Sequence, residues 1–482
     1  MQNKKTDEPI KVFAFVVQEF NRLAVLMRTD RKKAFDEIGV AGLIAKRQNS
    51  VPAGLYACGK TARLKLFGLA KDRINSDPEL KDRVRLKSYV SALEDLIVQR
   101  LIVNREPVTK DETTGILRRA KAEALKLFED RTYLFPVYLF WIDSLDTFLL
   151  GSIKFSKSKR YLSENEVAMK RSIENAIKIR LSKRKASDKT VDNTWLRKYM
   201  DDLYQSATKY YESYPWIAEV SIPSADPEVG WQRARKVLEQ TLNTLRLIVR
   251  SSKSHFIGLA DECYILPQSN SISVDKNGNF FFSESKSFVQ LKVNDDFFKN
   301  KGFLFSSNIV VRVIEKYRRT KNLSLLERRL FSSLFWFGEA WKELEPRPKL
   351  VKYVICLESL VMTGEREGLA EKLAERVAIV CTVDLAYRKK IYEDLKKIYD
   401  ARSSAAHGSG DYSDEKLTSL NRKAEQIAVW AIYGCAELFF TLGSLKNPGE
   451  ILKDYFVIQK LSTPKKTSKE FMRTLNNTEP RK

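Results

Sequence analysis

The chain has 482 residues, enough for two or three domains with a sizeable hydrophobic core. A hydrophobic content of 43% excludes an intrinsically disordered protein, and a formal net charge of +24 indicates a polyanionic partner. Residues 1–304 carry a net +15 of this charge, residues 305–445 a net +4 and the basic C-terminal tail 446–482 a net +5.

The cysteine and histidine content limits the chemistry of the chain. Five cysteines are scattered without a paired spacing, which predicts reduced thiols in a cytoplasmic protein. With two histidines and no Cys-x-x-Cys pair, we expect no metal site and no cofactor. The first residues lack the apolar stretch of a signal peptide. We therefore expect a mainly α-helical cytoplasmic protein with a small α+β module.

Residues 1–204 form a basic and mostly helical N-terminal region in this interpretation, broken by turn residues at Pro52 and 75–78. Residues 54–61 match the P-loop pattern G-x-x-x-x-G-K-[ST], which would make Lys60 and Thr61 nucleotide-binding residues. A P-loop needs a buried strand before it, whereas residues 46–53 are polar and contain a proline. We interpret the match as a coincidence, with a nucleotide-controlled switch as a third functional hypothesis.

A charged stretch within this region is a candidate nucleic-acid surface. Residues 152–200 hold 14 Lys/Arg against five Asp/Glu, including Lys183, Arg184 and Lys185. Cations that follow a phosphate backbone supply affinity that does not depend on base sequence. The stretch has few aromatic residues, so base stacking is not obvious. A solvated helix face or a linker is an equally good interpretation.

Residues 205–304 are predicted to be the small α+β module. Residues 216–222 alternate like a strand that Pro223 should end, and residues 230–249 have helical periodicity. His255 lies in a Ser/Lys-rich connection and is interpreted as a structural or surface residue. Further short strands and one hairpin-like turn are expected at 263–266, 271–274, 279–282 and 288–293, with the turn at 276–279.

Two apolar segments invite a membrane interpretation. Residues 133–142 are too few to span a bilayer and contain Pro136. Residues 427–445 are nearly long enough, with Glu437 as the single charge, but they lie where the last helix of a bundle is expected. We therefore predict a core helix and no contact with a membrane.

The segment 398–408 carries most of the functional information. Arg402 precedes His407 by five residues, and Ser403 follows the arginine. Arginine is a permanent forked cation that matches phosphate oxygens, and histidine titrates nearest neutral pH. The pair suits RNA cleavage by the RNA's own 2′-hydroxyl without a metal. The imidazole would move the proton while the guanidinium stabilises charge on phosphorus.

With Tyr399-Asp400, Arg402-Ser403 and His407-Gly408, this segment resembles the motif of the Apea-like branch of the HEPN domains. Residues 356–360 and 369–378 look like two further helices of that bundle, so the resemblance covers about residues 305–445. It implies an α-helical bundle that pairs, so that two Arg-x4-His motifs line one cleft. Many members of the family are metal-independent endoribonucleases of toxin and anti-phage systems that leave a 2′,3′-cyclic phosphate.

The resemblance implies that Arg402 and His407 are catalytic, with Ser403 auxiliary, RNA as substrate and a homodimer as the active form. One local histidine is too few for two-step acid–base work, and a symmetric dimer would supply a second His407. Five residues on an ideal helix turn through 500°, which places the two Cα positions about 140° apart. They share a cleft only if Arg402 lies at a helix start or if its long side chain swings round. Ser403 or Ser404 as an N-cap would support the first option.

A second hypothesis for the same segment is structural. Arg402 can pair with an acid while His407 closes a helix turn beside Gly408. The chain would then be a catalytically silent HEPN protein that binds nucleic acid or mediates assembly. The sequence names neither the RNA target nor a regulatory partner protein.

Overall fold

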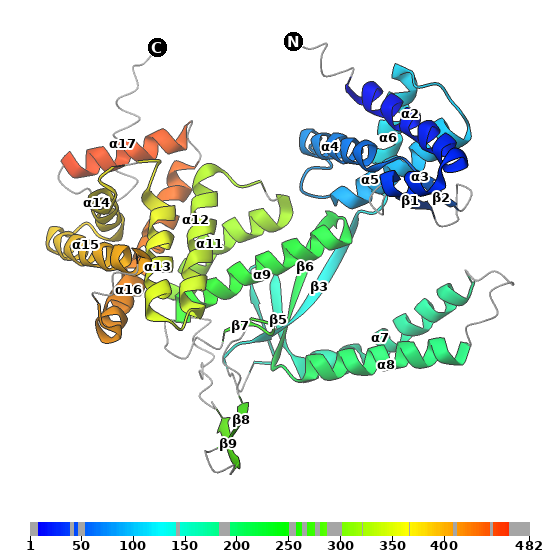
Figure 1. The fold of residues 1–482 in the computed structure, drawn as a ribbon. Coiled ribbons are helices and arrows are strands. Elements are labelled where there is room, and N and C mark those ends of the chain that lie inside the picture. Colours follow the sequence, from blue (N-terminus) through cyan, green and yellow to red (C-terminus); the bar gives the residue numbers. More distant parts are fainter. Residues whose placement is uncertain are drawn as a thin grey trace. The chain divides into compact units, whose positions relative to one another are not determined.

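The computed structural model describes residues 8–38, 43–46, 54–140, 145–182, 193–249, 257–262, 268–274, 280–286, 301–320, 322–365, 367–407, 412–443 and 447–461. These residues form fifteen α-helices, one π-helical segment and nine strands (Figure 1). The expectation of a mainly helical protein with a sheet-containing module is confirmed. The chain divides into two compact units, residues 1–132 with 222–233 and residues 133–221 with 234–482.

The first unit is mostly helical, as predicted, and contains one small hairpin. Its core lies where α2, α4, α5 and α6 turn apolar side chains towards one another, and Phe13, Leu66, Leu93 and Ile116 are fully buried there. In chain order its elements are α2 (Glu8–Thr29), α3 (Arg31–Ile38), β1 (Leu43–Lys46), β2 (Gly54–Ala57), α4 (Lys60–Ser76), α5 (Leu86–Ile97), the π-helical segment η2 (Val98–Val103) and α6 (Lys110–Leu125).

Most of a five-stranded antiparallel sheet, with the strand order β4-β5-β6-β3-β7, belongs to the second unit. Phe148 and Phe155 stack on it with ring centroids 4.8 Å apart, and Trp216 meets Phe148 edge-on at 5.5 Å. The strands are β3 (Glu129–Tyr138), β4 (Thr147–Leu150), β5 (Ile153–Lys157), β6 (Trp216–Ala225) and β7 (Gly258–Leu259).

The sheet module is larger than the sequence indicated. Three of its strands, β3, β4 and β5, precede residue 205, so the fold has no boundary at 204/205. Helices α7 (Ser158–Ser182) and α8 (Asn193–Glu212) are inserted between the paired strands β5 and β6, and they run side by side (Figure 1). Strand β6 also continues through Pro223. Its pairing with β5 ends at Glu219, before Pro223. Proline has no backbone N–H to donate, but none is needed there for hydrogen bonds to β5.

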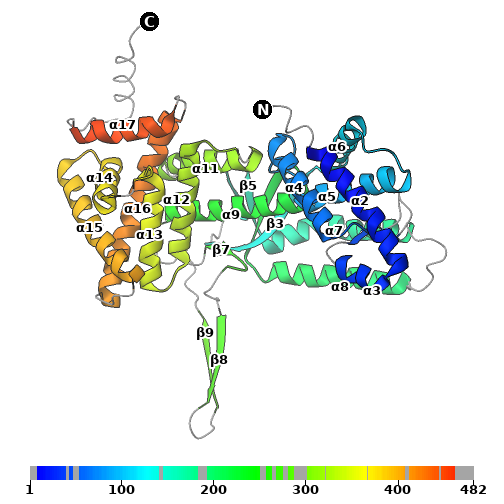
Figure 2. The ribbon, with the colours of Figure 1, turned by 45° about the horizontal axis from the view of Figure 1, so that its top comes forward.

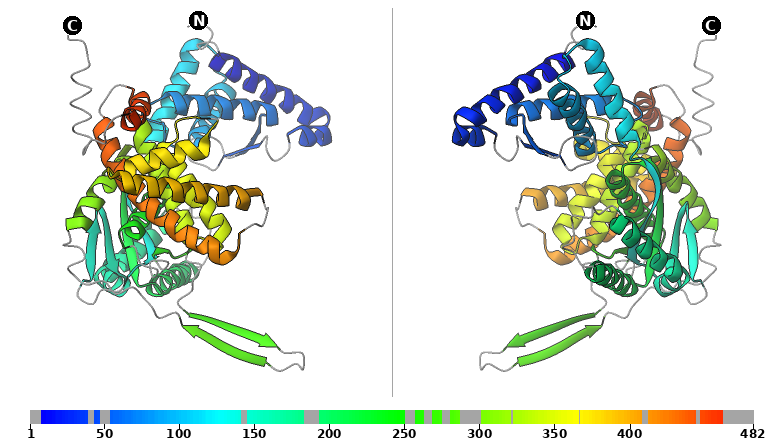
Figure 3. Two further views of the ribbon diagram at one scale, coloured as in Figure 1. Left: turned by 90° about the vertical axis from the view of Figure 1, so that its left-hand side faces the viewer. Right: turned by 90° about the vertical axis from the view of Figure 1, so that its right-hand side faces the viewer.

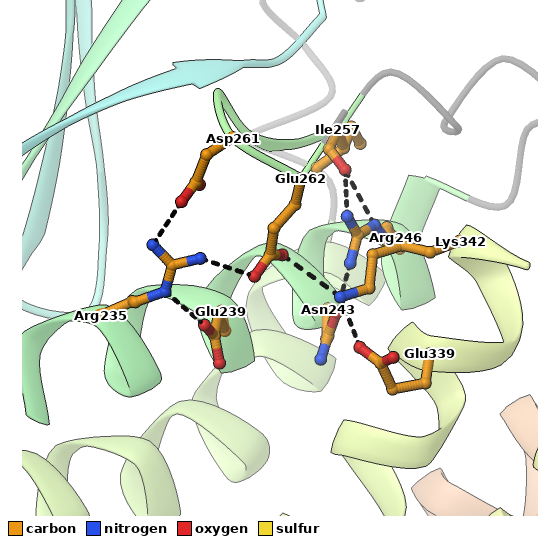
Figure 4. Close-up of polar contacts among 9 residues, drawn as sticks. All are labelled: Arg235, Glu239, Asn243, Arg246, Ile257, Asp261, Glu262, Glu339 and Lys342. Carbon is orange, nitrogen blue, oxygen red and sulfur yellow. Dashed lines mark hydrogen bonds and ion pairs between the residues drawn. The ribbon is translucent and has the colours of Figure 1, made fainter. Parts of the chain in front are cut away.

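Helix α9 (Pro227–Val249) confirms the helix predicted at 230–249. Figure 4 shows the polar contacts along it: Arg235 donates to Asp261 at 2.7 Å and to Glu262 at 2.9 Å. Glu262 also accepts from Lys342, at the end of α12, at 3.2 Å. These contacts join α9, the turn after β7 and the C-terminal helices. The periodicity predicts an apolar stripe at Leu238, Leu242, Leu245 and Ile248. The three leucines are buried, and Ile248 is half-buried.

The C-terminal helices form a bundle in which α12, α13 and α16 lie side by side (Figure 2). Helices predicted at 356–360 and 369–378 are confirmed as parts of α13 and α14. The bundle consists of α11 (Lys301–Thr320), α12 (Leu325–Lys342), α13 (Pro346–Val361), α14 (Leu369–Cys381), α15 (Leu385–His407), α16 (Asp414–Leu442) and α17 (Pro448–Leu461).

Helix α16 contains most of the apolar segment 427–445 and packs inside the bundle. Fourteen of its residues are buried. A Cβ on Gly434 would overlap the backbone carbonyl of Val380 in α14, so the two helices touch closely at this glycine. The prediction of a core helix is confirmed. Among the described residues, no helix is long and apolar enough to cross a membrane.

Two strands stand apart from the five-stranded sheet. β8 (Gln268–Val274) pairs antiparallel with β9 (Phe280–Lys286) (Figure 3), which confirms strands predicted at 271–274 and 279–282. The remaining expectations for this region lie outside the described residues: the strands 263–266 and 288–293, the turn 276–279 and His255.

Candidate active site

The whole Arg-x4-His motif lies on one helix. α15 begins at Leu385 and continues without a break to His407, so Arg402 is not at a helix start. Of the two ways in which Arg402 and His407 could share a cleft, the one with Arg402 at a helix start and Ser403 or Ser404 as the N-cap is therefore excluded. The reason is a buried apolar stripe that keeps the helix packed into the bundle up to the residue before Arg402, at Ile391, Leu395, Ile398 and Ala401.

The helical path separates the two candidate catalytic residues. Their Cα positions differ by about 140° around an ideal helix and by roughly 7.5 Å along it. His407 is the last helical residue, and its side chain lies outside the described part of the chain. Ser403 is half-buried in the turn that Arg402 begins. The Cα positions of Arg402 and His407 therefore lie on different sides of one copy of α15.

The surroundings of Arg402 bring two further residues into the site. Its guanidinium carbon lies 5.6 Å from the ring centroid of Tyr399, one turn earlier on α15. Its Nε is buried and has no hydrogen-bond partner among the described residues. Glu358, on the neighbouring helix α13, is half-buried and close enough to interact electrostatically with both residues. We call Glu358, Tyr399 and Arg402 the Arg402 cluster.

Burial shifts the pKa values of Glu358 and Tyr399. It raises the pKa of Glu358 above its ordinary value, and the positive charge of Arg402 opposes that rise. Burial also raises the pKa of the Tyr399 phenol, with help from the charge of Glu358 and against that of Arg402. Glu358 was not recognised as a site residue from the sequence. In the sequence, Glu358 is an acidic residue within an apolar stretch. This position indicates a site only once α13 and α15 are known to pack together.

The segment that matches the P-loop pattern has a different backbone. Gly54–Ala57, which would wrap the phosphates, form strand β2 and pair antiparallel with β1. Only Cys58 and Gly59 separate this strand from α4, which begins at the exposed Lys60. A Cβ on Gly59 would lie 3.4 Å from the Glu19 carboxylate, which would repel a phosphate here. The structure thus forms no loop at the position where a P-loop requires one.

The basic run Lys183–Lys185 lies outside the described residues, between α7 and α8. Helix α8 presents two aromatic rings close to it in sequence. Trp195 and Tyr199 are 57% and 43% exposed, and their rings stack at 5.3 Å with an interplanar angle of 7°. Exposed stacked rings provide a platform on which nucleic-acid bases can stack. Base stacking was not obvious from the sequence because four-residue spacing brings two rings together only on a helix.

Comparison with protein-family models, with curated proteins and with solved structures gave no match. Among the described residues, no group of three or more His, Cys, Asp or Glu side chains is arranged to hold a metal ion.

Proposed function

We propose that this protein is a metal-independent endoribonuclease of the HEPN type. The observation that carries the proposal is the half-buried Arg402 guanidinium, which lies over the Tyr399 ring and forms no ion pair with a described residue. An arginine used as a structural ion-pair partner has its donors filled by carboxylates, whereas a phosphate-binding arginine keeps donors for its ligand. His407 follows on the same helix, at the point where α15 ends.

The proposed reaction is transesterification followed by release of the leaving strand. His407 accepts the proton of the 2′-hydroxyl, whose oxygen attacks the adjacent phosphorus as the bond to the 5′-oxygen breaks. The leaving 5′-oxygen takes up a proton from a second histidine, and the other product ends in a 2′,3′-cyclic phosphate. Arg402 stabilises the charge that builds on the phosphoryl oxygens.

A homodimer supplies what one chain lacks. Since the Cα positions of Arg402 and His407 lie on different sides of α15, a symmetric pair of helices can place an arginine and two histidines around one phosphate. Glu358 acts as a positioning residue, because its partly buried carboxylate holds the guanidinium through its charge. The role as a toxin or anti-phage effector rests on the family resemblance alone.

The deciding experiment is incubation of labelled RNA with the purified full-length protein in EDTA. We expect cleavage to persist in EDTA, to leave cyclic phosphate ends and to stop when the scissile nucleotide is a deoxynucleotide. His407→Ala should lose about 10²–10⁴ in cleavage rate while RNA affinity is kept. Strong dependence on magnesium would contradict the mechanism.

The angular separation of Arg402 and His407 favours one alternative, a catalytically silent HEPN protein that binds nucleic acid or mediates assembly. That hypothesis predicts RNA binding without cleavage by the wild type. The third hypothesis, a nucleotide-controlled switch through Lys60 and Thr61, requires binding that Lys60→Ala removes. With β2 in place of the phosphate loop, we expect no ATP binding at this position.

A further inference from the structure

A cavity with both polar and apolar lining lies in the bundle, and none of its lining residues belongs to the Arg402 cluster. Its volume is about 380 Å³, within the range of small-molecule sites, and it lies between the end of α12, the start of α13 and the first half of α16. Trp341, Leu344 and Pro346 form an apolar wall. Lys349 of α13 and Glu425 of α16 line it as well. We call it the α13–α16 cavity.

The two charged groups face the cavity without forming an ion pair with each other in the described structure. Lys349 Nζ donates to the Glu343 carbonyl oxygen at 3.2 Å, and Glu425 Oε2 accepts from the Tyr353 hydroxyl at 3.4 Å. Burial lowers the pKa of Lys349 and raises the pKa of Glu425, and each residue's charge opposes the shift of the other. A ligand that offers an acceptor to Lys349 and donors to Glu425 would complete both interactions.

Asn421 adds an unsatisfied acceptor to the same wall. It is 5% exposed and lies one turn before Glu425 on α16. Its Nδ2 donates to the Pro346 carbonyl oxygen at 2.8 Å, which fixes the orientation of the amide. Oδ1 is buried and has no hydrogen-bond partner among the described residues. Buried acceptors are normally paired, so the polar wall calls for hydrogen-bond donors.

We propose that the α13–α16 cavity binds a guanine base. The Watson–Crick edge of guanine presents two adjacent donors, N1–H and N2–H, beside the acceptor O6. Glu425 can accept from both donors while Lys349 donates to O6, and the base plane packs on the apolar wall. The exposed Arg422 at the rim is placed for the phosphate of the same nucleotide.

The other bases fit this arrangement less well. Adenine offers one donor on this edge and turns the lone pair of N1 towards the carboxylate. Cytosine has one donor and two acceptors there, and uracil has a single N–H between two carbonyl oxygens. Each of them would leave part of the Glu425 carboxylate without a donor, and unpaired buried groups are the main source of discrimination in such sites.

The same base can come from a free nucleotide or from RNA, and one titration series separates the two sources. The full-length His407→Ala protein, which keeps RNA intact, is titrated by calorimetry with GMP, IMP and AMP. It is also titrated with a short uridine oligonucleotide that contains one guanosine and with its all-uridine counterpart. A free nucleotide is the ligand if GMP binds as tightly as the guanosine oligonucleotide. RNA is the ligand if the oligonucleotide binds far more tightly and loses that advantage with its guanosine.

We expect GMP to bind about tenfold more tightly than IMP, which lacks the N2 amine, and AMP to bind weakest, as expected when one or two base-edge hydrogen bonds are missing. Glu425→Gln should weaken GMP binding about ten- to a hundredfold because the Gln amide puts a donor opposite a donor. Glu415→Gln, in the exposed first turn of the same helix, is the matched control.

Lys349→Met is the second variant, because it keeps the apolar stem and removes the donor to O6. Melting temperatures of all variants show whether a loss of binding reflects loss of the fold. Equal affinity for GMP and AMP, no GMP binding by the His407→Ala protein, or unchanged affinity in folded Glu425→Gln would overturn the proposal. Since only binding is measured, failure here leaves the cleavage test in EDTA untouched, and failure of cleavage leaves this titration untouched.

Discussion

The guanidinium of Arg402 lies over an aromatic ring and within electrostatic range of a carboxylate. Its carbon lies 5.6 Å from the centroid of Tyr399, and its positive charge acts on the partly buried Glu358. Stacking on an aromatic face fixes the plane of a guanidinium and leaves its in-plane N–H groups for a ligand. An ammonium group cannot reproduce this geometry, so the chemistry proposed for this position depends on the shape of the cation as well as its charge.

Arg402→Lys tests that dependence. The variant keeps one positive charge but cannot form the two-pronged hydrogen bonds with phosphate oxygens. We expect a large loss in the RNA cleavage rate with little change in melting temperature, measured side by side on the purified protein. Arg328→Lys, at an exposed arginine of α12 outside both proposed sites, controls for the substitution itself. Cleavage at the wild-type rate in Arg402→Lys would identify Arg402 as a structural residue.

Glu365 belongs to the connection between α13 and α14 and makes that connection sensitive to pH. Burial raises its pKa, but hydrogen bonds from Arg376 and Thr363 outweigh burial and lower the pKa to about 2. The Arg376 contact measures 2.7 Å. Because the folded-state pKa lies below the ordinary value, the ionised carboxylate stabilises the fold above about pH 4.5. That contribution is lost as the pH falls towards 2.

Glu365→Gln should therefore lower the melting temperature at pH 7 and have progressively less effect as the pH falls below about 4. The experiment is a thermal denaturation series from pH 7 to pH 3 for the wild type and the variant. Glu367→Gln, an exposed acid two residues away, is the matched control and should have little effect throughout. A constant difference between Glu365→Gln and the wild type across the series would contradict the pKa assignment.

At the scale of elements, α9 and α12 approach so closely that one position has no room for a side chain. A Cβ on Gly338 of α12 would overlap the amide of Asn243 on α9. Asn243 in turn accepts a hydrogen bond from the buried Arg246 (Figure 4), so its amide cannot move away without breaking that bond. This close approach links the sheet module and the bundle within the second unit.

Gly338→Ala should destabilise the protein by about 1–3 kcal/mol, because added volume in a packed interface forces the neighbouring side chains to shift. Gly68→Ala is the matched control, since Gly68 is an exposed helical glycine with no atom within 4 Å of the added Cβ. There the higher helix propensity of alanine should stabilise by about 0.5–1 kcal/mol. Urea denaturation of both variants measures the two effects, and a neutral Gly338→Ala would show that α9 and α12 are not tightly packed.

The elements that the sequence predicted well are those whose pattern is local. The periodicity of residues 230–249 indicated α9, and the apolar segment 427–445 indicated the core helix α16. The boundary at 204/205 failed because β5 pairs with β6 across the inserted α7 and α8, and pairing over such a distance leaves no local trace. The option of an N-cap at Ser403 or Ser404 is excluded because the packing of α15 overrides the cap propensity of serine.

The candidate site also divides into residues that a local motif indicates and residues that only packing between helices brings in. Arg402 and His407 were found from a short motif in consecutive residues. Glu358 comes close to Arg402 only because α13 packs against α15, and Lys349 and Glu425 line one cavity only because α13 packs on α16. A half-buried acid in a helical run looks like any other acid until its neighbours on another helix are known.

At the scale of the whole chain, most of the excess positive charge lies in a different part of the sequence from the residues proposed to cleave RNA. The helices around the Arg402 cluster, residues 305–445, carry a net +4, whereas residues 1–304 carry a net +15. A catalytic region with little excess charge needs another surface to hold a long polyanion, since phosphate contacts supply most of the sequence-independent affinity for nucleic acid. The helical pair α7 and α8, with its basic connection and the exposed rings of Trp195 and Tyr199, is the surface that we expect to do so.

Neutralising Lys183, Arg184 and Lys185 together to Gln should weaken binding of single-stranded RNA and flatten its salt dependence. Each phosphate neutralised releases a counterion, so the log–log slope of affinity against salt should change by about 0.7 for each phosphate that the variant no longer neutralises. Cleavage at saturating RNA should remain mostly intact, because these residues hold substrate and do not touch the reacting phosphate. Fluorescence anisotropy over a series of salt concentrations gives the slope, and single-turnover cleavage gives the rate.

The control is a variant with the same reduction of charge in the basic tail, Lys465, Lys466 and Lys469 to Gln. If total charge decides affinity, both triple variants weaken RNA binding equally. If the position of the charge decides affinity, only the Lys183–Lys185 variant binds RNA more weakly. Trp195→Ala should lower RNA affinity further without changing the salt slope, because base stacking releases no counterions. An unchanged slope in the Lys183–Lys185 variant would mean that this surface does not bind RNA and that its charge serves another acidic partner.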